Sequence, residues 1–588
     1  MIPRTQFVCL LLSLIELSDS KLVKTSYGTL EGSTVWSEDK NHKYTFKSVP
    51  FAKPPLGKLR FALPEVPDTW HGIRDASNYS AACMSKQSKR RPNEVASEDC
   101  LYINIFSSER CLVKKCPVIV YYHGGAFHSN SAVMFPDDFI LERYVSEDIV
   151  FTIPAFRLGV FGQLYFGRNN QLKENLLHST YSHSIFDAVR ALEYVNTEIA
   201  NFGGDPNRVT IMGHSTGGTM IDALGFSQLI DPEIKLFQQI IGLSAPGDFG
   251  YEELAVESSL FISKKLGCFS GNLMDFDLAP VLNCMRNMNA IDILKMQIQM
   301  TEEDGMNFTR IIKGAPFMEL GGKLSEFKKT TPSRSLLFGT TEHEFVFADP
   351  YIAGHFLDLE NPTAVYKYFD NIVMNQSWSC IVFTFKNTFS AGIFMKHDSA
   401  AVFVSTATYS EAMVNTGADV FVFETTQKPF SAHVTDMQYF IGLHREVVHY
   451  PDMDLLDYFY SKFLANFTKY GCPSPLWPKY DPVRMNYLKL EIDTELGITP
   501  KMEDNFNRKI VEFWLNDMVQ LDRNISEQKT KTIGSERSKE LQLSNENFRL
   551  YKQRWFYAAT IIFCVMFFML FKLLKKPKSD ECKPLISH

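Results

Sequence analysis

A serine between glycines is the first place in this sequence of 588 residues where residue types and spacing predict chemistry. Residues 213–217, Gly-His-Ser-Thr-Gly, fit the pattern G-x-S-x-G and directly follow the apolar, strand-like residues 208–212. A tight turn between a strand and a helix presents the serine hydroxyl at the carboxyl edge of a sheet, with the helix N-terminus aimed at the reacting group. The pattern alone also arises by chance, and the strand before it makes it more specific. We therefore expect Ser215 to be a nucleophile.

A second glycine-rich stretch supplies the groups that a serine nucleophile needs beside it. His123-Gly124-Gly125 directly follows the strand-like residues 118–122. Bare backbone at such a place can turn its N–H groups toward the oxyanion that develops on a substrate carbonyl. We expect Gly124, Gly125 and Thr216 to form an oxyanion hole.

Further stretches of the chain repeat the motifs of one enzyme family. They are residues 49–57 with 59–61, 97–104, 157–162 and 201–207. Over residues 24–520 the sequence resembles the type-B carboxylesterases, the cholinesterase-like family of α/β-hydrolases. This resemblance implies a large, mainly parallel central sheet with helices on both faces. No Cys/His group has the spacing of a structural zinc site and no HExxH motif occurs, so we expect neither metal nor cofactor.

The resemblance also implies a triad in the order Ser, Glu, His. Ser215 takes the first role, Glu344 falls on the position of the acid, and His433 lies in a stretch, 432–439, similar to the family's histidine loop. The family usually has Asp-Glu-Gly where this chain has His343-Glu344-Phe345, so Glu342 remains an alternative acid. The implied reaction is attack of Ser215 on an ester carbonyl, followed by transfer of the acyl group to water, a sugar or another alcohol.

Two departures from the cholinesterases bear on the substrate. His214 precedes the nucleophile where cholinesterases have Glu, which removes a carboxylate that would attract a cation. The loop between Cys83 and Cys100 is short and contains no Trp to bind a quaternary ammonium group. We expect a small-molecule ester that is uncharged or glycosylated, and not acetylcholine.

The same family contains catalytically silent, membrane-anchored adhesion proteins of the neuroligin type, which is the alternative function for this chain. Those proteins lose the triad, whereas this chain has residues at all three positions. The resemblance further implies disulfides Cys83–Cys100 and Cys268–Cys284. Four further cysteines have no pairing from the resemblance, although the first two could close a small loop: Cys111, Cys116, Cys380 and Cys472.

Alternating strands and helices must hold these side chains. Six short apolar runs predict strands buried on both faces: residues 118–122, 149–153, 209–212, 239–243, 335–338 and 419–424. Residues 184–201 have an apolar helical stripe, and we expect the opposite face, with Asp187 and Glu198, to be polar. This alternation predicts an α/β domain with a mainly parallel sheet.

Composition divides the chain into five parts. Residues 1–20 are expected to be a signal peptide, because one arginine precedes a short apolar run that small residues close. Residues 21–522 are uniform in composition and predict one large domain, whereas residues 523–554 are polar and predict a stalk. Residues 555–574 are apolar and long enough to cross a bilayer as one helix. The lysines after them place the tail, residues 575–588, in the cytoplasm, as in a single-pass type I membrane protein.

The ends and the charge of the chain predict its route and its partners. Glu581 lies four positions before Leu585 and Ile586, a pattern similar to the dileucine signals that sorting adaptors read. We expect an endosomal–lysosomal organelle or the plasma membrane, with the catalytic domain lumenal or extracellular. The net charge of −7 argues against nucleic acid as a partner. Glycosylation is expected at Asn78, Asn307, Asn375, Asn466 and Asn524.

Overall fold

The computed structural model describes most of the predicted large domain. The described residues are 20–36, 41–86, 94–167, 182–247, 249–250, 252–271, 277–314, 316–318, 323–344, 359–369, 400–445 and 451–532. They belong to two compact units. The first comprises residues 1–346, 350–358 and 389–515, and the second comprises residues 347–349, 359–388 and 516–588.

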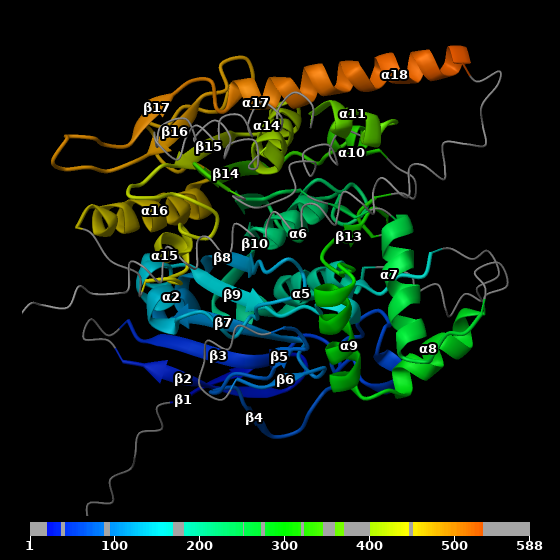
Figure 1. Ribbon diagram of the computed structural model, residues 1–588. Coiled ribbons are helices and arrows are strands. Elements are labelled where there is room, and N and C mark those ends of the chain that lie inside the picture. Colours follow the sequence, from blue (N-terminus) through cyan, green and yellow to red (C-terminus); the bar gives the residue numbers. More distant parts are fainter. Residues whose placement is uncertain are drawn as a thin grey trace, which may run out of the picture. The chain divides into compact units, whose positions relative to one another are not determined.

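A 13-stranded sheet runs through the first unit (Figure 1). In spatial order its main path is β1 (Ser20–Lys24), β2 (Thr29–Val35), β3 (Lys43–Pro50), β7 (Tyr102–Ser108), β9 (Val150–Pro154), β8 (Cys116–Tyr122), β10 (Gly204–His214), β11 (Gln239–Leu243), β14 (Ser335–Thr341), β15 (Val420–Thr425), β16 (Tyr487–Leu490) and β17 (Lys501–Glu503). A short strand, β4 (Ile73–Asp75), pairs with β2. Two small sheets join β5 (Ala82–Cys83) to β6 (Ala96–Ser97) and β12 (Phe249–Gly250) to β13 (Ile311–Ile312).

The centre of the large sheet is parallel and its two edges are antiparallel. All neighbours from β9 to β16 are parallel, whereas the pairings of β1, β2, β3, β7 and β9 along the N-terminal edge, and of β16 with β17, are antiparallel. The sheet is therefore mixed. The predicted strands are its parallel core, and their residues are buried because helices lie on both faces (Figure 1).

Helices of the first unit follow the strands in the alternation that the sequence predicts. They are α1 (Glu109–Lys114), α2 (Asp137–Arg143), α3 (Gly159–Gln163), α5 (His183–Glu198), α6 (Thr216–Gly225), α7 (Glu252–Lys265), α8 (Leu278–Asn287), α9 (Ala290–Glu303), α10 (Leu324–Lys329), α14 (Ala400–Val414), α15 (Met437–Phe440), α16 (Pro451–Tyr470) and α17 (Arg508–Glu512). In the second unit, α11 (Pro362–Phe369) packs against α18 (Val519–Thr532).

The predicted helix over residues 184–201 is α5 with a following 3₁₀ turn, but its polar face is wrong at two positions. Asp187 is fully buried and accepts hydrogen bonds from Nε and Nη2 of Arg157, at 2.8 and 2.7 Å. Glu198 is 3% exposed and accepts one from the backbone N–H of Ser26, at 3.1 Å. These partners replace water, so the two carboxylates face the interior.

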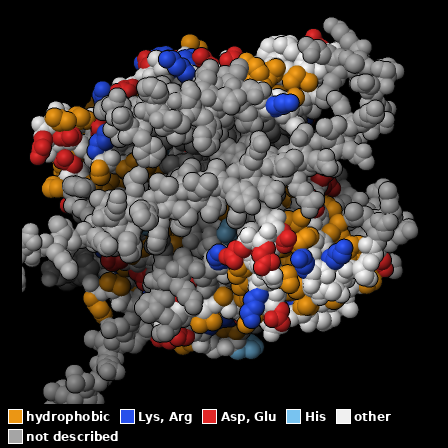
Figure 2. Space-filling view, in the orientation of Figure 1, with side chains coloured by type: hydrophobic (Ala, Val, Ile, Leu, Met, Phe, Trp, Pro, Cys, Tyr) orange, Lys and Arg blue, Asp and Glu red, His pale blue; other side chains and the backbone are white. Residues whose placement is uncertain are grey.

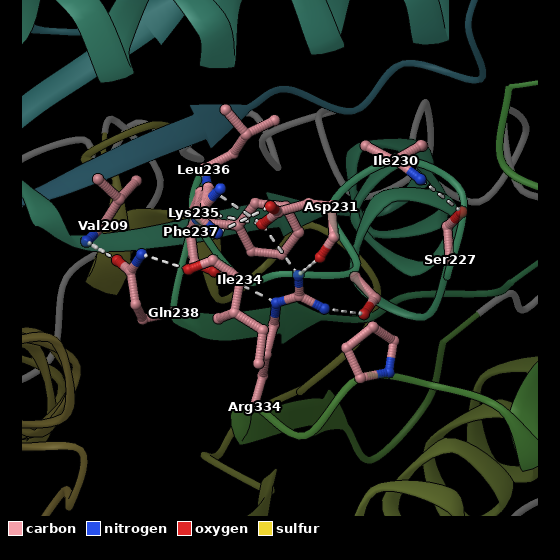
Figure 3. A network of polar contacts seen from close by, with 12 residues as sticks. Val209, Ser227, Ile230, Asp231, Ile234, Lys235, Leu236, Phe237, Gln238 and Arg334 are labelled. Carbon is pink, nitrogen blue, oxygen red and sulfur yellow. Dashed lines mark hydrogen bonds and ion pairs between the residues drawn. The ribbon is translucent and has the colours of Figure 1, made fainter.

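A buried arginine fastens β14 to the loop between α6 and β11 (Figure 3). The guanidinium of Arg334, which directly precedes β14, donates to the carbonyl oxygens of Gly225 and Phe237 and to both the carbonyl and the carboxylate of Asp231. Asp231 in turn accepts from backbone N–H groups of its own loop, at Lys235 among others. Burial lowers the pKa of Arg334, and the charge of Asp231 opposes that shift. The network therefore joins the segment that leads into β11 to the segment that leads into β14.

Both disulfides that the resemblance implied are confirmed. Cys83 pairs with Cys100 and Cys268 with Cys284, and Cys111 closes a short loop with Cys116. In the part of the chain that the structure describes, Cys472 is the free cysteine. Cys380 lies outside the described residues.

Most predictions for the chain ends concern residues outside the described ranges. These are residues 1–19, the predicted membrane span 555–574, the tail with Glu581, Leu585 and Ile586, and the sequon at Asn375. Within the described ranges, no helix is both long and apolar enough to cross a membrane. The predicted boundary after residue 522 falls inside α18, where Asp522 accepts hydrogen bonds from the backbone of Glu360 and Asn361.

One face of the surface is drawn in Figure 2. Where described residues are visible there, acidic, basic and hydrophobic side chains are interspersed. A mixed surface of this kind produces little long-range field, because the fields of neighbouring opposite charges cancel and salt screens the remainder.

Candidate active site

Ser215 occupies a strained turn between β10 and α6. Its φ and ψ angles are 58° and −124°, a conformation that costs free energy in a residue with a Cβ atom. Two backbone hydrogen bonds hold the turn: the N–H of Ser215 donates to the carbonyl of Leu243 on the neighbouring β11, and its carbonyl accepts from the N–H of Thr219. The strain is therefore maintained by the sheet and by the first turn of α6.

The glycines around Ser215 are required by close packing. A Cβ atom on Gly213 would lie 2.1 Å from the carbonyl oxygen of Gly217, and one on Gly217 would lie 2.1 Å from that of Tyr122 in β8. These distances are far below van der Waals contact, and the obstructing atoms belong to the backbone. The G-x-S-x-G pattern here thus reflects the packing of α6 against β8 and β10.

The structure brings together the three residues that the resemblance implied. Nε2 of His433 lies 2.9 Å from Oγ of Ser215, and its Nδ1 lies 2.7 Å from Oε2 of Glu344. The second carboxylate oxygen, Oε1, accepts from Oγ of Ser244 at 2.8 Å and from the backbone N–H of Thr341 at 2.7 Å. Ser215 and Glu344 are 9% and 2% exposed.

Sheet order explains how residues so far apart in the chain meet. Ser215 directly follows β10, Ser244 follows β11, Glu344 follows β14, and His433 comes after β15. These four strands are consecutive and parallel in the sheet. Their carboxyl ends therefore lie along one edge, which is where open α/β sheets assemble sites.

The alternative acid, Glu342, points elsewhere. Its carboxylate lies 3.5 Å from Nζ of Lys428 and its side chain is 25% exposed, whereas that of Glu344 is fully buried. His433 contacts Glu344, so Glu342 is not the partner of the imidazole.

The loop of Gly124 and Gly125 lies directly against Ser215. A Cβ atom on Gly124 would stand 2.8 Å from Cβ of Ser215 and 2.7 Å from the carbonyl oxygen of His214. The φ angle of Gly125 is 124°, which favours glycine. Nδ1 of the buried His123 lies 2.8 Å from the carbonyl oxygen of Gly124. Burial lowers the pKa of His123 to about 4, so its ring is neutral at pH 7 and Nδ1–H can donate this bond.

Thr216, the third residue predicted for the oxyanion hole, is the first residue of α6. Backbone N–H groups in the first turn of a helix have no partner within the helix. They also lie at the positive end of its dipole. Gly124 thus contacts Ser215, and Thr216 begins the helix that follows it. The role of the N–H groups of Gly124, Gly125 and Thr216 as oxyanion donors stays a prediction.

Two residues near the site were missed by reasoning from the sequence. Ser244 carries a side-chain donor to Glu344, and its place directly after β11 was the available signal. Asp436 lies three residues after His433 and is 1% exposed. Nothing in the sequence pattern distinguishes it from a surface aspartate, because its burial depends on the packing of α15 and α16.

A possible metal-binding group does not change this picture. Among the described residues, Cys111, Cys116 and Asp148 have ligand atoms within 4.8 Å of one another. The two sulfur atoms form a disulfide, which cannot supply the thiolates that a metal would need.

Comparison with known proteins matches this chain to carboxylesterases and other ester hydrolases. The model of the carboxylesterase family matches residues 19–514. Acylcarnitine hydrolase of Mus musculus is 34% identical over 286 residues, 46% of this chain and 47% of that protein. Carboxylesterase 4A of Bos taurus is 26% identical over 533 residues, 82% of this chain and 93% of that protein. Para-nitrobenzyl esterase of Bacillus subtilis (strain 168) is 33% identical over 297 residues, 49% and 55% of the two chains.

The extent of these matches differs between relatives. The chain spans about half the length of the mouse acylcarnitine hydrolase and of the bacterial esterase, and nearly the whole of the bovine protein. The family match covers the whole large sheet from β1 to β17 and every residue of the site described above.

Proposed function

Since the chain belongs to the carboxylesterase family, we propose that it hydrolyses carboxylic esters through an acyl-enzyme on Ser215. The observation that carries this proposal is the continuous contact from Ser215 through His433 to Glu344, at 2.9 and 2.7 Å. Such a chain is the geometry in which an imidazole activates a hydroxyl and a carboxylate orients the imidazole.

The proposed reaction uses only groups of this chain and the two substrates. Oγ of Ser215 attacks the carbonyl carbon while Nε2 of His433 takes its proton, and Glu344 stabilises the imidazolium. The N–H groups of Gly124, Gly125 and Thr216 donate to the oxyanion of the tetrahedral intermediate. The intermediate collapses as the C–O bond breaks, and the leaving alcohol takes the proton from His433. Water then attacks the acyl-enzyme with the same proton transfers and releases the acid.

An uncharged substrate fits the electrostatics beside Ser215. His214 is 1% exposed, and burial, followed by the charges of His433 and His444, lowers its pKa well below the usual value. The ring is neutral at pH 7 and offers no charge to attract or repel a cation. Efficient turnover of acetylthiocholine would contradict this part of the proposal.

Labelling with a fluorophosphonate probe tests the nucleophile. We expect the full-length protein to be labelled at Ser215, and the Ser215→Ala variant to remain unlabelled. We also expect that variant to lose about 10⁴–10⁶ in kcat on a model ester such as p-nitrophenyl acetate. Folded, glycosylated protein that takes no label would favour the catalytically silent, neuroligin-like alternative.

The acceptor of the acyl group is a finer question within the same chemistry. A sugar or another alcohol can attack the acyl-enzyme in place of water, with the same transfer of a proton to His433. Incubating the enzyme with an ester and increasing concentrations of an alcohol, and measuring the ratio of new ester to free acid, separates a hydrolase from a transferase.

A further inference from the structure

Two buried polar atoms face one another beside the triad without a hydrogen-bond partner. Nε2 of His214 lies 3.9 Å from Oδ1 of Asp436, and both side chains are 1% exposed. Neither atom has a partner among the described residues. A buried polar atom without a hydrogen-bond partner destabilises the fold, so two such atoms aimed at each other require an explanation.

Both side chains are held against the triad by separate elements. The ring of His214, at the end of β10, stacks on that of His433 with centroids 5.1 Å apart and an interplanar angle of 26°. Asp436 directly precedes α15, and its Oδ2 accepts a hydrogen bond from the hydroxyl of Tyr460 in α16 at 3.0 Å. A change of charge at this pair therefore occurs within the packing around the catalytic imidazole.

The surroundings of Asp436 make its charge responsive near neutral pH. Burial, and next the negative charge of Glu344, raise the pKa of Asp436 to about 7, although the hydrogen bond from Tyr460 and the positive form of His433 oppose the shift. The titratable groups that face the pair are Tyr121 of β8, His214 of β10, Glu344 after β14, His433 and Tyr439 around α15, His444 after it, and Tyr460 of α16.

We propose that Asp436, paired with His214, is a positioning residue that places a second carboxylate charge beside the imidazolium of His433. This inference rests on the proposed function and concerns how pH regulates the same site. With Asp436 ionised, Nε2–H of His214 donates to Oδ1. As the pH falls, the carboxyl group takes one proton from solvent, its O–H donates to Nε2 of the other His214 tautomer, and the stabilising charge is lost.

Asp436→Asn tests the proposal because it removes the charge and keeps the shape. Above about pH 8 the wild-type carboxylate is ionised, and we expect its kcat/KM to exceed that of the variant about tenfold, the equivalent of one pKa unit. Below about pH 6 the wild-type carboxyl is protonated, and we expect the two proteins to converge. The readout is the ratio of their kcat/KM values for p-nitrophenyl acetate from pH 5 to 9.

A matched variant separates this effect from the loss of any buried carboxyl group. Asp222 on α6 is fully buried, burial raises its pKa, and neither carboxylate oxygen has a partner within the described part of the chain. The charge that acts on it is that of Lys328, and not one of the triad. We expect the ratio of the kcat/KM of the wild-type protein to that of Asp222→Asn to be the same at every pH from 5 to 9.

Variants of His214 test the pairing itself. His214→Gln keeps a donor that reaches Asp436, so the pH at which the ratio changes should stay near 7. His214→Phe keeps a ring against His433 but removes the donor, so the change should move to higher pH because the carboxylate loses a partner.

A ratio for Asp436→Asn that is constant from pH 5 to 9 overturns the proposal and leaves Asp436 a packing residue. Fluorophosphonate labelling of every variant, with Ser215→Ala as the blank, shows whether the site has formed. Failure of this inference with labelling intact is thereby distinguished from failure of the proposed function.

Discussion

Because Gly124 lies against Ser215, the methyl group added by a Gly124→Ala substitution should lower the activity. Gly124→Ala adds a Cβ atom 2.8 Å from that of Ser215 and 2.7 Å from a backbone oxygen, so the loop must move away from the nucleophile. We expect kcat for p-nitrophenyl acetate to fall about 10²–10³-fold, the usual effect of losing one oxyanion donor. Gly271→Ala is the control, since its Cβ would meet Phe269 at an ordinary 3.4 Å. Full activity in Gly124→Ala would contradict the prediction that this loop donates a hydrogen bond to the oxyanion.

At the same scale, residues differ in how far the sequence predicts their roles. Ser215 and its glycines are predictable because a tight strand-to-helix turn leaves room for few side chains. The acid is harder, since Glu342 and Glu344 share one short stretch after β14 and only the folded turn directs Glu344 to His433. Asp436 is not predictable, because its burial and its distance from His214 arise from elements far apart in the chain.

The network of Arg334 joins elements that position the site, and its removal should destabilise the first unit. Arg334→Met leaves the carboxylate of Asp231 buried and without its cation. We expect a loss of about 3–5 kcal/mol in unfolding free energy, typical of breaking a buried pair on one side. Arg484→Met, at an exposed pair with Asp504, should cost less than about 1 kcal/mol. Thermal unfolding at one fixed scan rate compares the two, and equal shifts would refute the structural role of the network.

Six of the strands that are buried on both faces were predictable from continuous apolar runs. β7 is buried along its whole length as well, but it was not predicted, because Asn104, Ser107 and Ser108 interrupt its apolar residues. The six apolar runs correspond to β8, β9, β10, β11, β14 and β15, with ends displaced by a few residues at most except in β10, which begins earlier. The antiparallel strands β1 to β3 were not predicted, because polar residues interrupt their apolar ones and no continuous apolar run marks them. The polar face of α5 was wrong because a carboxylate such as Asp187 can be buried when an arginine pairs with it.

On the scale of the whole molecule, we propose that the chain is anchored by residues 555–574 with its catalytic domain on the lumenal side, and that adaptors sort it through Glu581, Leu585 and Ile586. Replacing Leu585 and Ile586 together by Ala should move the protein from endosomal–lysosomal membranes to the cell surface, as measured by surface biotinylation. Ser587→Ala is the control in the same tail. An unchanged distribution would contradict the sorting signal.

The pH of the compartment to which the protein is sorted should determine whether Asp436 is ionised and so whether it assists the triad. In a compartment below about pH 6 the carboxyl group of Asp436 is protonated, because its pKa is about 7. The wild-type protein and Asp436→Asn should therefore turn over ester equally well inside acidic organelles. Combined with the Leu585 and Ile586 substitutions, the same comparison at the neutral cell surface should show the wild-type residue about tenfold more active. A fluorogenic ester added to intact cells measures the surface activity, and equal rates there would show that Asp436 does not assist the triad at neutral pH.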